Sequence, residues 1–196
     1  AVPQPVNTTF AEAAAVLQGA MTAWFFLSSA NIQPGQKVLI FGASGGVGGY
    51  AVQLAKNHFK AEVTGVCRGS KMNYVKSLGA DHVIDYTQED FTENGQVYDV
   101  VFDTVGKTSV LRTGKSIKDN GWYLLATFGL PVFVRLLWLS KKRNINMEYG
   151  TLADSLSVKD SIIRANATSA STARSLCPSA PARRHAPCTA GRTRRC

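Results

Sequence analysis

The sequence predicts an α/β fold, a single Rossmann-type domain built on a doubly wound parallel sheet. From Lys37 onward, strand-like and helix-like segments alternate, which requires parallel strands joined by crossover helices. The apolar run that starts at Lys37 breaks into a glycine-rich turn and then continues with helical spacing. With 196 residues, 45% of them hydrophobic, the chain can bury one core of about one domain.

The expected elements follow from apolar runs and from the residues that interrupt them. The strands are expected at Lys37–Phe41, Glu62–Val66, His82–Ile84, Asp99–Phe102, Trp122–Thr127 and Ile145–Glu148. The crossover helices are expected at Gly46–His58, at Lys71–Leu78 before Gly79, and at Ser109–Asp119 before the stop signal Asn120-Gly121.

An alanine-rich segment, residues 11–30, precedes the first strand and favours a helix. We expect this lead-in helix to be broken near Gly19, because glycine is a poor helix former. The turn Gln33-Pro34-Gly35 then directs the chain into the first strand.

Composition divides the chain into a dinucleotide-binding domain, residues 1–153, and an atypical basic tail, residues 154–196. Of the 22 lysines and arginines, eight lie in residues 151–196, together with only two of the 13 acidic residues. Residues 164–196 contain no acidic and no aromatic residue, so no core can form there. Three interpretations stay open: a disordered tail, a nucleic-acid arm, or an out-of-frame translation, which we favour.

The folded part shows no sign of secretion or membrane insertion. Three of the four cysteines lie in the tail, which leaves Cys67 alone in the expected core and indicates a reducing compartment. The longest apolar stretch, Phe128–Leu139, is shorter than a membrane span and contains Pro131 and Arg135. We therefore expect a cytoplasmic protein with no membrane partner.

The glycine-rich turn predicts nucleotide binding. Residues 37–48 read KVLIFGASGGVG, in which the pattern G-x-G-x-x-G appears as Ala43, Gly45 and Gly48. A strand precedes the turn and a helix opens within it, so the helix N-terminus can present free N–H groups to a pyrophosphate. The alternative is a glycine turn with no ligand.

The same residues, Gly42 to Gly46, also satisfy G-x-S-x-G, the nucleophile elbow of serine hydrolases, with Ser44 as nucleophile. That mechanism needs a histidine downstream. The candidates are His58 in a helix, His82 at a strand start and His185 in the tail, and none is well placed. The hydrolase remains a minor alternative.

The end of the second strand favours NADP(H) over NAD(H). An acidic residue about twenty positions after the turn would bind the ribose of NAD, but Cys67 stands there. Arg68, Ser70 and Lys71 follow and suit an extra phosphate. The alternative for Lys71 is a solvated lysine at a helix start, and Cys67 reads as a small buried residue.

The segments KVLIFGASGGVG, AVQLAK, VTGVCRGSK, VKSLGADHVIDY and YDVVFDTVGK, in this order, resemble the zinc-independent quinone oxidoreductase branch of the medium-chain dehydrogenase/reductase superfamily. The resemblance covers about residues 1–153. It implies that the turn amides of Ser44, Gly45, Gly46 and Val47 hold the pyrophosphate, and that Lys71 and Tyr86 hold the adenosine phosphate of NADPH.

The resemblance also implies contacts to the rest of the cofactor. Thr22, in GAMTAW, matches the threonine that packs against the nicotinamide ring. Thr104, Val105 and Gly106 match the loop that lines the cofactor, and Phe128 and Gly129 belong to the strand end beside the nicotinamide. The alternative for each of these residues is packing at a strand end.

The expected function is that of an NADPH-dependent oxidoreductase that transfers hydride to quinones or activated alkenes. No catalytic acid and no metal ligand is assigned in this chain. Family members carry a β-rich domain before this region, and nothing here corresponds to it, so the chain is expected to be a cofactor-binding fragment with little turnover. The resemblance also implies a possible homodimer through the strand near Ile145. Alternatives are an inactive nucleotide-binding module and a protein that binds nucleic acid through residues 174–195, although we expect no nucleic-acid partner.

Overall fold

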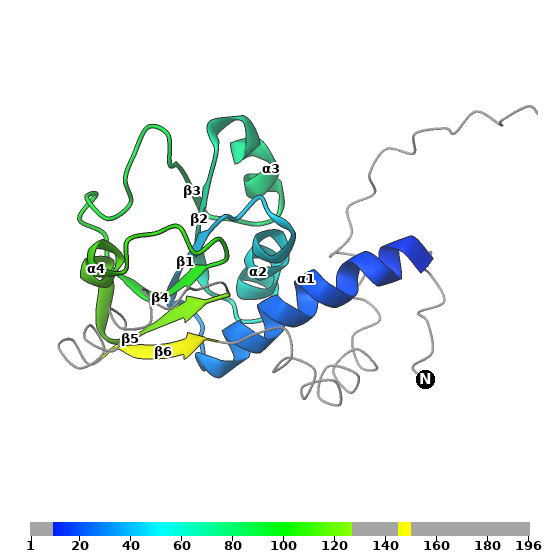
Figure 1. Cartoon of the computed structure of the whole chain (residues 1–196), viewed down its shortest axis with the longest axis horizontal. Helices are drawn as coiled ribbons and strands as arrows, with labels where there is room; N and C mark the ends of the chain where they lie inside the picture. Colours follow the sequence, from blue (N-terminus) through cyan, green and yellow to red (C-terminus); the bar gives the residue numbers. More distant parts are fainter. Residues whose placement is uncertain (1–9, 127–144, 150–196) are drawn as a thin grey trace, which may run out of the picture.

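The structure, a computed structural model, describes residues 10–126 and 145–149 (Figure 1). Helices and short 3-10 turns alternate with strands along nearly the whole described chain. The helical elements are α1 (Phe10–Ser29), α2 (Gly46–Asn57), η1 (Gly69–Lys71), α3 (Met72–Ser77), α4 (Val110–Thr113) and η2 (Gly114–Ser116). The strands are β1 (Lys37–Phe41), β2 (Glu62–Cys67), β3 (His82–Asp85), β4 (Tyr98–Asp103), β5 (Ile117–Leu125) and β6 (Asn146–Tyr149).

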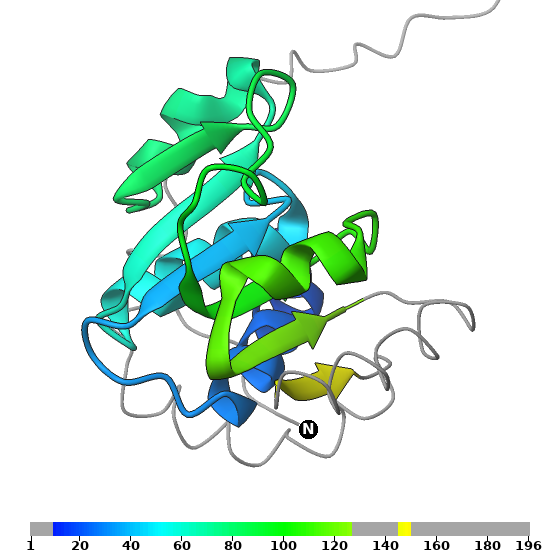
Figure 2. The same ribbon diagram turned by 90° about the vertical axis from the view of Figure 1, so that its left-hand side faces the viewer.

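The six strands form one parallel sheet in the order β3-β2-β1-β4-β5-β6, and their arrows point the same way in Figure 2. Strand order reverses between β1 and β4, because the chain builds outward from β1 first to one side and then to the other. In such a sheet, ligands bind beyond the carboxyl ends of the strands at this reversal. The doubly wound Rossmann-type fold expected from the sequence is confirmed.

Helices α1 and α2 cover one face of the sheet (Figure 1). From α1, Phe26 and Leu27 are buried against the strands, and the Phe26 ring lies 5.2 Å from that of Phe102 on β4. Ala51 and Val52 bring α2 onto the same face. Burial of these side chains fixes the position of α2, and with it the position of the turn that precedes it.

The opposite face is covered, within the described residues, by α4 and by the segment between β3 and β4. Val110 of α4 and Phe91 of that segment pack with Leu39, Val101 and Tyr123 of the strands. Tyr123 and Leu39 are fully buried. Among the described residues, the helix on this face is short, since α4 has four residues whereas α1 on the other face has 20.

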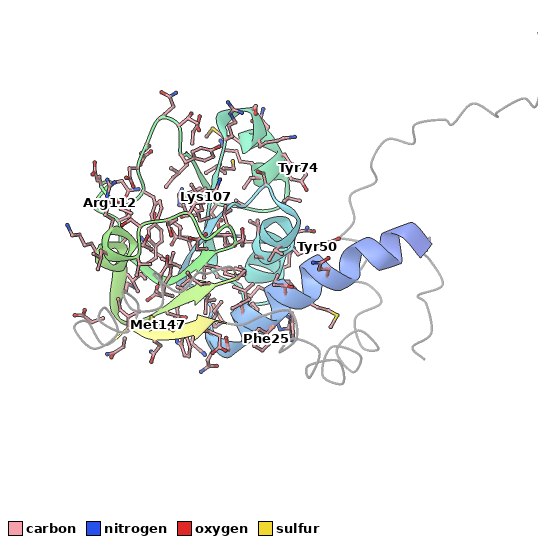
Figure 3. The ribbon with its side chains drawn as sticks, in the orientation of Figure 1. Phe25, Tyr50, Tyr74, Lys107, Arg112 and Met147 are labelled. Atoms are coloured by element: carbon pink, nitrogen blue, oxygen red, sulfur yellow. The ribbon has the colours of Figure 1, made fainter. Side chains whose placement is uncertain are left out.

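The expected break in the lead-in helix is wrong, because α1 runs without interruption through Gly19. A Cβ atom added at Gly19 would lie 2.8 Å from the ring of Tyr50 on α2 and 3.0 Å from the carbonyl oxygen of Gly46. Figure 3 shows Tyr50 where the two helices meet. Gly19 therefore allows close packing of two helices, which the sequence alone did not distinguish from a helix break.

The helix expected at Ser109–Asp119 is also wrong beyond its first turns. The helical elements α4 and η2 end at Ser116, and β5 starts at Ile117, five residues before the strand start expected at Trp122. Asn120, with φ of 63°, marks an irregularity within β5, where the pairing with β4 shifts register. The Asn-Gly signal therefore bends a strand here instead of ending a helix.

The other expected elements are confirmed, with ends that differ by two residues at most. Thr127, the expected end of the fifth strand, lies outside the described residues. The assignment of 154–196 as an atypical tail also concerns residues outside the described part, and stays a prediction.

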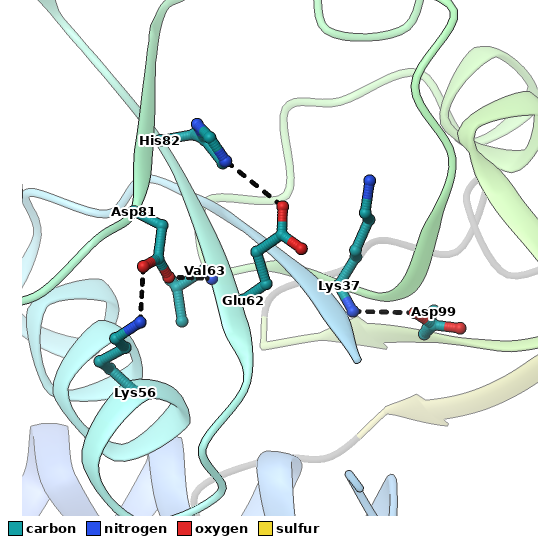
Figure 4. Close-up of polar contacts among 7 residues, drawn as sticks. All are labelled: Lys37, Lys56, Glu62, Val63, Asp81, His82 and Asp99. Atoms are coloured by element: carbon teal, nitrogen blue, oxygen red, sulfur yellow. Dashed lines mark hydrogen bonds and ion pairs between the residues drawn. The ribbon is translucent and has the colours of Figure 1, made fainter. Parts of the chain in front are cut away.

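Two carboxylates fasten the amino-terminal edge of the sheet (Figure 4). Asp81 accepts hydrogen bonds from the Lys56 ammonium at 2.5 Å and from the Val63 amide at 2.8 Å. Asp99 accepts one from the Lys37 amide at 2.8 Å, at the start of β1. These contacts lie at the edge opposite to the glycine turn and belong to the scaffold.

Candidate functional site

The glycine-rich turn follows β1 at the carboxyl edge of the sheet. Gly42 adopts a φ of 79°, a conformation that L side chains rarely adopt. The amides of Gly42 and Ala43 both donate to the carbonyl oxygen of Val66 on β2, at 3.0 Å each, and the Gly45 amide donates to the Gly42 oxygen at 2.9 Å. The turn is therefore held to the neighbouring strand by its backbone.

The first turn of α2 leaves its amides available for a ligand. The N-cap residue is Gly45, no side chain caps the helix, and the first turn has no acidic residue. The amides of Gly46, Val47 and Gly48 thus have no intrahelical acceptor. A Cβ at Gly46 would meet no atom within 4 Å, so a ligand can approach the backbone there. Free N–H groups and the helix dipole together favour an anion.

The loop after β4 packs directly on the glycine turn. A Cβ at Gly42 would lie 2.6 Å from both Thr104 Oγ1 and Val105 Cγ2. The Thr104 hydroxyl donates to the carbonyl oxygen of Phe41 at 2.8 Å. Val105 is 40% exposed and stands at the surface beside the turn. The structure thus brings together Thr104, Val105 and the glycine turn, which are about 60 residues apart in sequence.

A buried carboxylate that the sequence reasoning missed shapes this loop. Asp103 is fully buried at the end of β4, and its Oδ1 accepts the amides of Val105 at 2.9 Å and Gly106 at 2.8 Å. Its Oδ2 accepts a hydrogen bond from the Thr108 hydroxyl at 2.5 Å. The Thr108 hydroxyl oxygen in turn lies 2.8 Å from the Tyr123 hydroxyl oxygen. The sequence signal that could have revealed this carboxylate is the acidic residue at the end of the apolar strand β4.

Burial within this network raises the pKa of Tyr123 well above its ordinary value, although a hydrogen bond with Thr108 acts in the opposite direction. The tyrosine is therefore neutral at physiological pH, and because the Thr108 hydroxyl donates to Asp103, the Tyr123 hydroxyl donates to the Thr108 oxygen. The network fixes the backbone of the loop after β4 from its buried side, while the side chain of Val105 stays exposed and can contact a ligand.

The ends of β2 and β3 form the third part of the site. Cys67 is buried, and burial, with a smaller contribution from the charge of Asp85, raises the pKa of its thiol. This confirms that Cys67 is a packing residue. Arg68 and Lys71 are exposed, and Tyr86, half-exposed, donates its amide to the Cys67 oxygen at 3.2 Å. Lys71 and Tyr86 therefore lie on neighbouring segments at one edge of the sheet.

A hollow of about 300 Å³ opens between β1, the segment after β3, and α4. Aromatic side chains of Phe41, Tyr86 and Phe91 line it, and Lys107 and Arg112 stand on the α4 side (Figure 3). The rings of Phe41 and Tyr86 lie 6.3 Å apart. The sequence reasoning missed this hollow, because its walls come from three separate segments.

Ion pairs fix one wall of the hollow. The Arg112 guanidinium lies 2.7 Å from a carboxylate oxygen of Asp90 and 2.6 Å from one of Glu93. Arg112 thus connects α4 to the segment between β3 and β4. The three side chains are between 39% and 71% exposed, so the contribution of these pairs to stability is small.

Three residues were expected beside the nicotinamide ring, namely Thr22, Phe128 and Gly129. Thr22 lies one helical turn after Gly19 on α1, and its hydroxyl donates to the Gln18 oxygen at 2.7 Å. Its methyl group, not its hydroxyl, is therefore the part available for packing against a ring. Phe128 and Gly129 lie outside the described residues.

Neither of the described histidines after Ser44 is placed to act as the base of the hydrolase alternative. Ser44 precedes α2, whereas His58 follows the far end of this 12-residue helix, roughly 18 Å away at 1.5 Å per residue. His82 starts β3 at the amino-terminal edge, where it lies 3.3 Å from Glu62 (Figure 4). His185 lies outside the described residues.

Within residues 10–126 and 145–149, no cluster of three His, Cys, Asp or Glu side chains is placed to bind a metal ion. None of the helices described there is both long and apolar enough to cross a membrane.

The family profile described as zinc-binding dehydrogenase matches residues 46–169, which is more than half of the chain. The chain belongs to this family. The match starts at the first residue of α2, so it includes the free amides of Gly46, Val47 and Gly48 and every described element after them.

Relatives of known name extend this result. The chain is 37% identical over 119 residues to an "NADPH-dependent alkenal/one oxidoreductase, chloroplastic" of Arabidopsis thaliana, which covers 60% of this chain and 30% of that protein. It is 35% identical over 131 residues to a "Quinone oxidoreductase-like protein 2 homolog" of Nematostella vectensis, covering 63% and 36%. The resemblance to the quinone oxidoreductase branch is thereby confirmed, while zinc independence stays a prediction.

Among solved structures, an "NAD-dependent alcohol dehydrogenase" superimposes with a TM-score of 0.69 at 28% identity, covering 83% of this chain and 50% of that one. The chain spans about a third of the length of the curated relatives it matches.

Proposed function

We propose that this chain is the dinucleotide-binding part of an NADPH-dependent oxidoreductase that reduces quinones or activated carbon–carbon double bonds. The observation that carries the proposal is the uncapped first turn of α2, which begins at the strand-order reversal and has open space at Gly46. The names of the two curated relatives support the choice of substrate class and of cofactor.

The backbone around α2 fits a pyrophosphate. The amides of Ser44, Gly45, Gly46 and Val47 were expected to hold it; of these, the Gly45 amide is already bonded to the Gly42 oxygen. The amides of Ser44, Gly46 and Val47, with that of Gly48, are therefore the donors we propose. An anion there would be bound without desolvating any carboxylate of the first helical turn, because none is present.

The proposed site for the adenosine end of the dinucleotide consists of the hollow and the segments that follow β2 and β3. We propose that its ring lies over the hollow lined by Phe41 and Tyr86, where aromatic walls suit a flat base. The extra phosphate of NADPH would then lie near Arg68 and Lys71, two exposed cations on the segment after β2.

When bound, NADPH supplies the hydride, and the residues of this chain position the cofactor and keep it in place. Thr22, Thr104 and Val105, with Phe128 and Gly129, are proposed to line its nicotinamide half. Gly106 acts through the backbone, since its amide is bonded to Asp103. We assign no catalytic acid or base to this chain, so its contribution to rate is one of orientation and exclusion of water.

We also propose, as the family resemblance implies, that two copies pair through β6, an outermost strand of the described sheet. The proposed location is the cytoplasm, and the proposed substrates are small molecules.

Cofactor binding tests the proposal more directly than turnover, because the chain spans only part of its relatives. The purified chain is titrated with NADPH and NADH, and binding is followed by nicotinamide fluorescence and energy transfer from Trp24 and Trp122. Tighter binding of NADPH is expected. Equal affinities would refute the phosphate assignment, and absence of binding would refute the proposal as a whole.

A matched pair of lysine variants localises the phosphate. Lys71→Gln is expected to weaken NADPH binding by roughly 5- to 30-fold, the equivalent of about 1–2 kcal/mol, with no effect on NADH. Lys76→Gln is the control, because Lys76 is equally exposed but lies in the last turn of α3. Similar losses in both variants would show that the effect is one of net charge.

A further inference from the structure

Asp85, the last residue of β3, lies between the two segments that we propose to surround the cofactor phosphate. It pairs in register with Cys67, the last residue of β2. Arg68 and Lys71 follow Cys67, and Tyr86 follows Asp85. We propose that Asp85 is a positioning residue that holds these segments together and thereby sets the preference for NADPH over NADH; this inference rests on the proposed function.

The carboxylate of Asp85 is bonded on both sides. Its Oδ1 accepts the amide of Thr87 at 3.0 Å and the Thr87 hydroxyl at 2.8 Å, which fixes the backbone that carries Tyr86. Its Oδ2 lies against Gly69, where a Cβ atom would overlap it, and the Gly69 amide donates to the carboxylate. One side chain therefore connects the residue after Tyr86 with the residue after Arg68.

The turn after β2 contains no buried residue of its own, although α3, which begins at Met72 against the core, follows it directly. Gly69–Lys71 forms a single 3-10 turn without a side-chain cap, and the Lys71 amide donates back to the Arg68 oxygen at 2.8 Å. None of the three residues is buried. Within Gly69–Lys71, the contact between Asp85 and Gly69 is therefore the side-chain anchor that the structure shows, and we infer that Lys71 depends on it for its position.

The charge of Asp85 makes the inference testable, because a negative charge alone would weaken NADPH binding, whereas the proposed positioning role strengthens it. Hydrogen bonds from Thr87, more than those from Gly69 and the charge of Arg68, hold the pKa of Asp85 below its ordinary value, so it is ionised at neutral pH. A carboxylate near a phosphate repels it. If charge alone mattered, removing it would tighten NADPH binding; if positioning dominates, removing it weakens NADPH binding.

The test measures dissociation constants for NADPH and NADH in the full chain and its variants. Asp85→Asn removes the charge at constant shape and places an amide donor where the Gly69 amide needs an acceptor. Gly69→Ala disturbs the same contact from the other side, because its Cβ would overlap the carboxylate. For each variant, we expect the preference for NADPH to fall at least fivefold, with NADH affinity changed less than twofold.

Asp90→Asn serves as the matched control. Asp90 accepts the Thr92 amide at 2.9 Å and the Thr92 hydroxyl at 2.7 Å, the same pattern as Asp85. It lines the hollow proposed for the adenine, which both cofactors share, so any effect should be equal for NADPH and NADH. Thermal unfolding of each variant separates loss of binding from loss of fold.

The outcomes distinguish this inference from the proposed function. Wild-type preference for NADPH that both variants retain, or that Asp85→Asn increases, overturns the positioning role and leaves the proposed function intact. If Asp85→Asn does not fold, Gly69→Ala alone decides. A wild-type chain that binds both cofactors equally, or neither, overturns the phosphate assignment and this inference with it.

Discussion

Two glycines in the first turn of α2 allow one substitution to be compared in opposite surroundings. A Cβ at Gly48 would overlap the carbonyl oxygen of Gly42 and lie 2.8 Å from its carbon and 2.9 Å from the Cα of Ala43. These are backbone atoms of the glycine turn, so they cannot rotate away. A Cβ at Gly46 would meet nothing within 4 Å. Alanine is therefore tolerated at Gly46 and must displace the turn at Gly48.

The expected magnitudes follow from these contacts. Overpacking in a rigid environment costs about 1–3 kcal/mol, whereas alanine in place of an unhindered helical glycine gains at most about 0.5–1 kcal/mol. For a chain of this size, 1 kcal/mol corresponds to roughly 2–4 °C in Tm. Gly48→Ala should thus lower Tm by about 2–12 °C, and Gly46→Ala should leave Tm unchanged or slightly higher.

Differential scanning calorimetry and the NADPH titration together test this reasoning. Gly48→Ala should also bind NADPH more weakly, because displacement of the turn moves the free amides of α2. Equal melting temperatures for the two variants would refute the argument, since it depends on the overlap at Gly48 alone. The pair is informative even without cofactor binding, because the comparison of stability does not require a ligand.

Three further predictions concern the scaffold. Burial would raise the pKa of Asp81, but hydrogen bonds from Lys56 and a strand amide outweigh it, so the pKa is lowered. The stabilisation of the fold by ionised Asp81 is complete above the ordinary pKa of about 4 and is lost as the pH falls through the lowered pKa. Asp81→Asn should therefore reduce the fall of Tm between neutral and acidic pH. Tyr123→Phe removes the hydroxyl 2.8 Å from Thr108 and should cost about 0.5–1.5 kcal/mol by urea unfolding, whereas an unchanged midpoint would show that the network does not stabilise the fold. Phe102→Ala empties a fully buried position on β4 and should cost about 3–5 kcal/mol at an unchanged m-value; a loss under 1 kcal/mol would contradict the assigned core.

The sequence predicted most of the sheet well because most of its strands carry a local signal. β1 and β2 are rich in apolar residues and end in glycine-rich or polar segments, and their bounds are found within one residue. The glycine turn is equally local, since its residues are consecutive. The parts of the site that depend on these runs could therefore be placed in advance at the carboxyl edge of the sheet.

The errors have a common physical origin in contacts between distant residues. Helix propensity predicts a break at Gly19, whereas the structure packs the Tyr50 ring against it. Ile117 and Trp122 pair with Tyr98 and Val100 across a register shift that a local pattern does not contain. Asp103 could be noticed as an acid at the end of an apolar strand, but its partners become known only when the loop is folded.

The unequal cover of the two sheet faces has a consequence for motion. One face is closed by a 20-residue helix, whereas the described cover of the other consists of a four-residue helix and a segment joined to it by exposed ion pairs. Because exposed ion pairs stabilise little, amides of α4 and residues 86–97 should exchange with deuterium faster than those of β1. Because α4 and residues of the segment 86–97 also line the hollow, a dinucleotide bound there would slow this exchange. The ligand would then stabilise described segments that exposed ion pairs alone hold weakly.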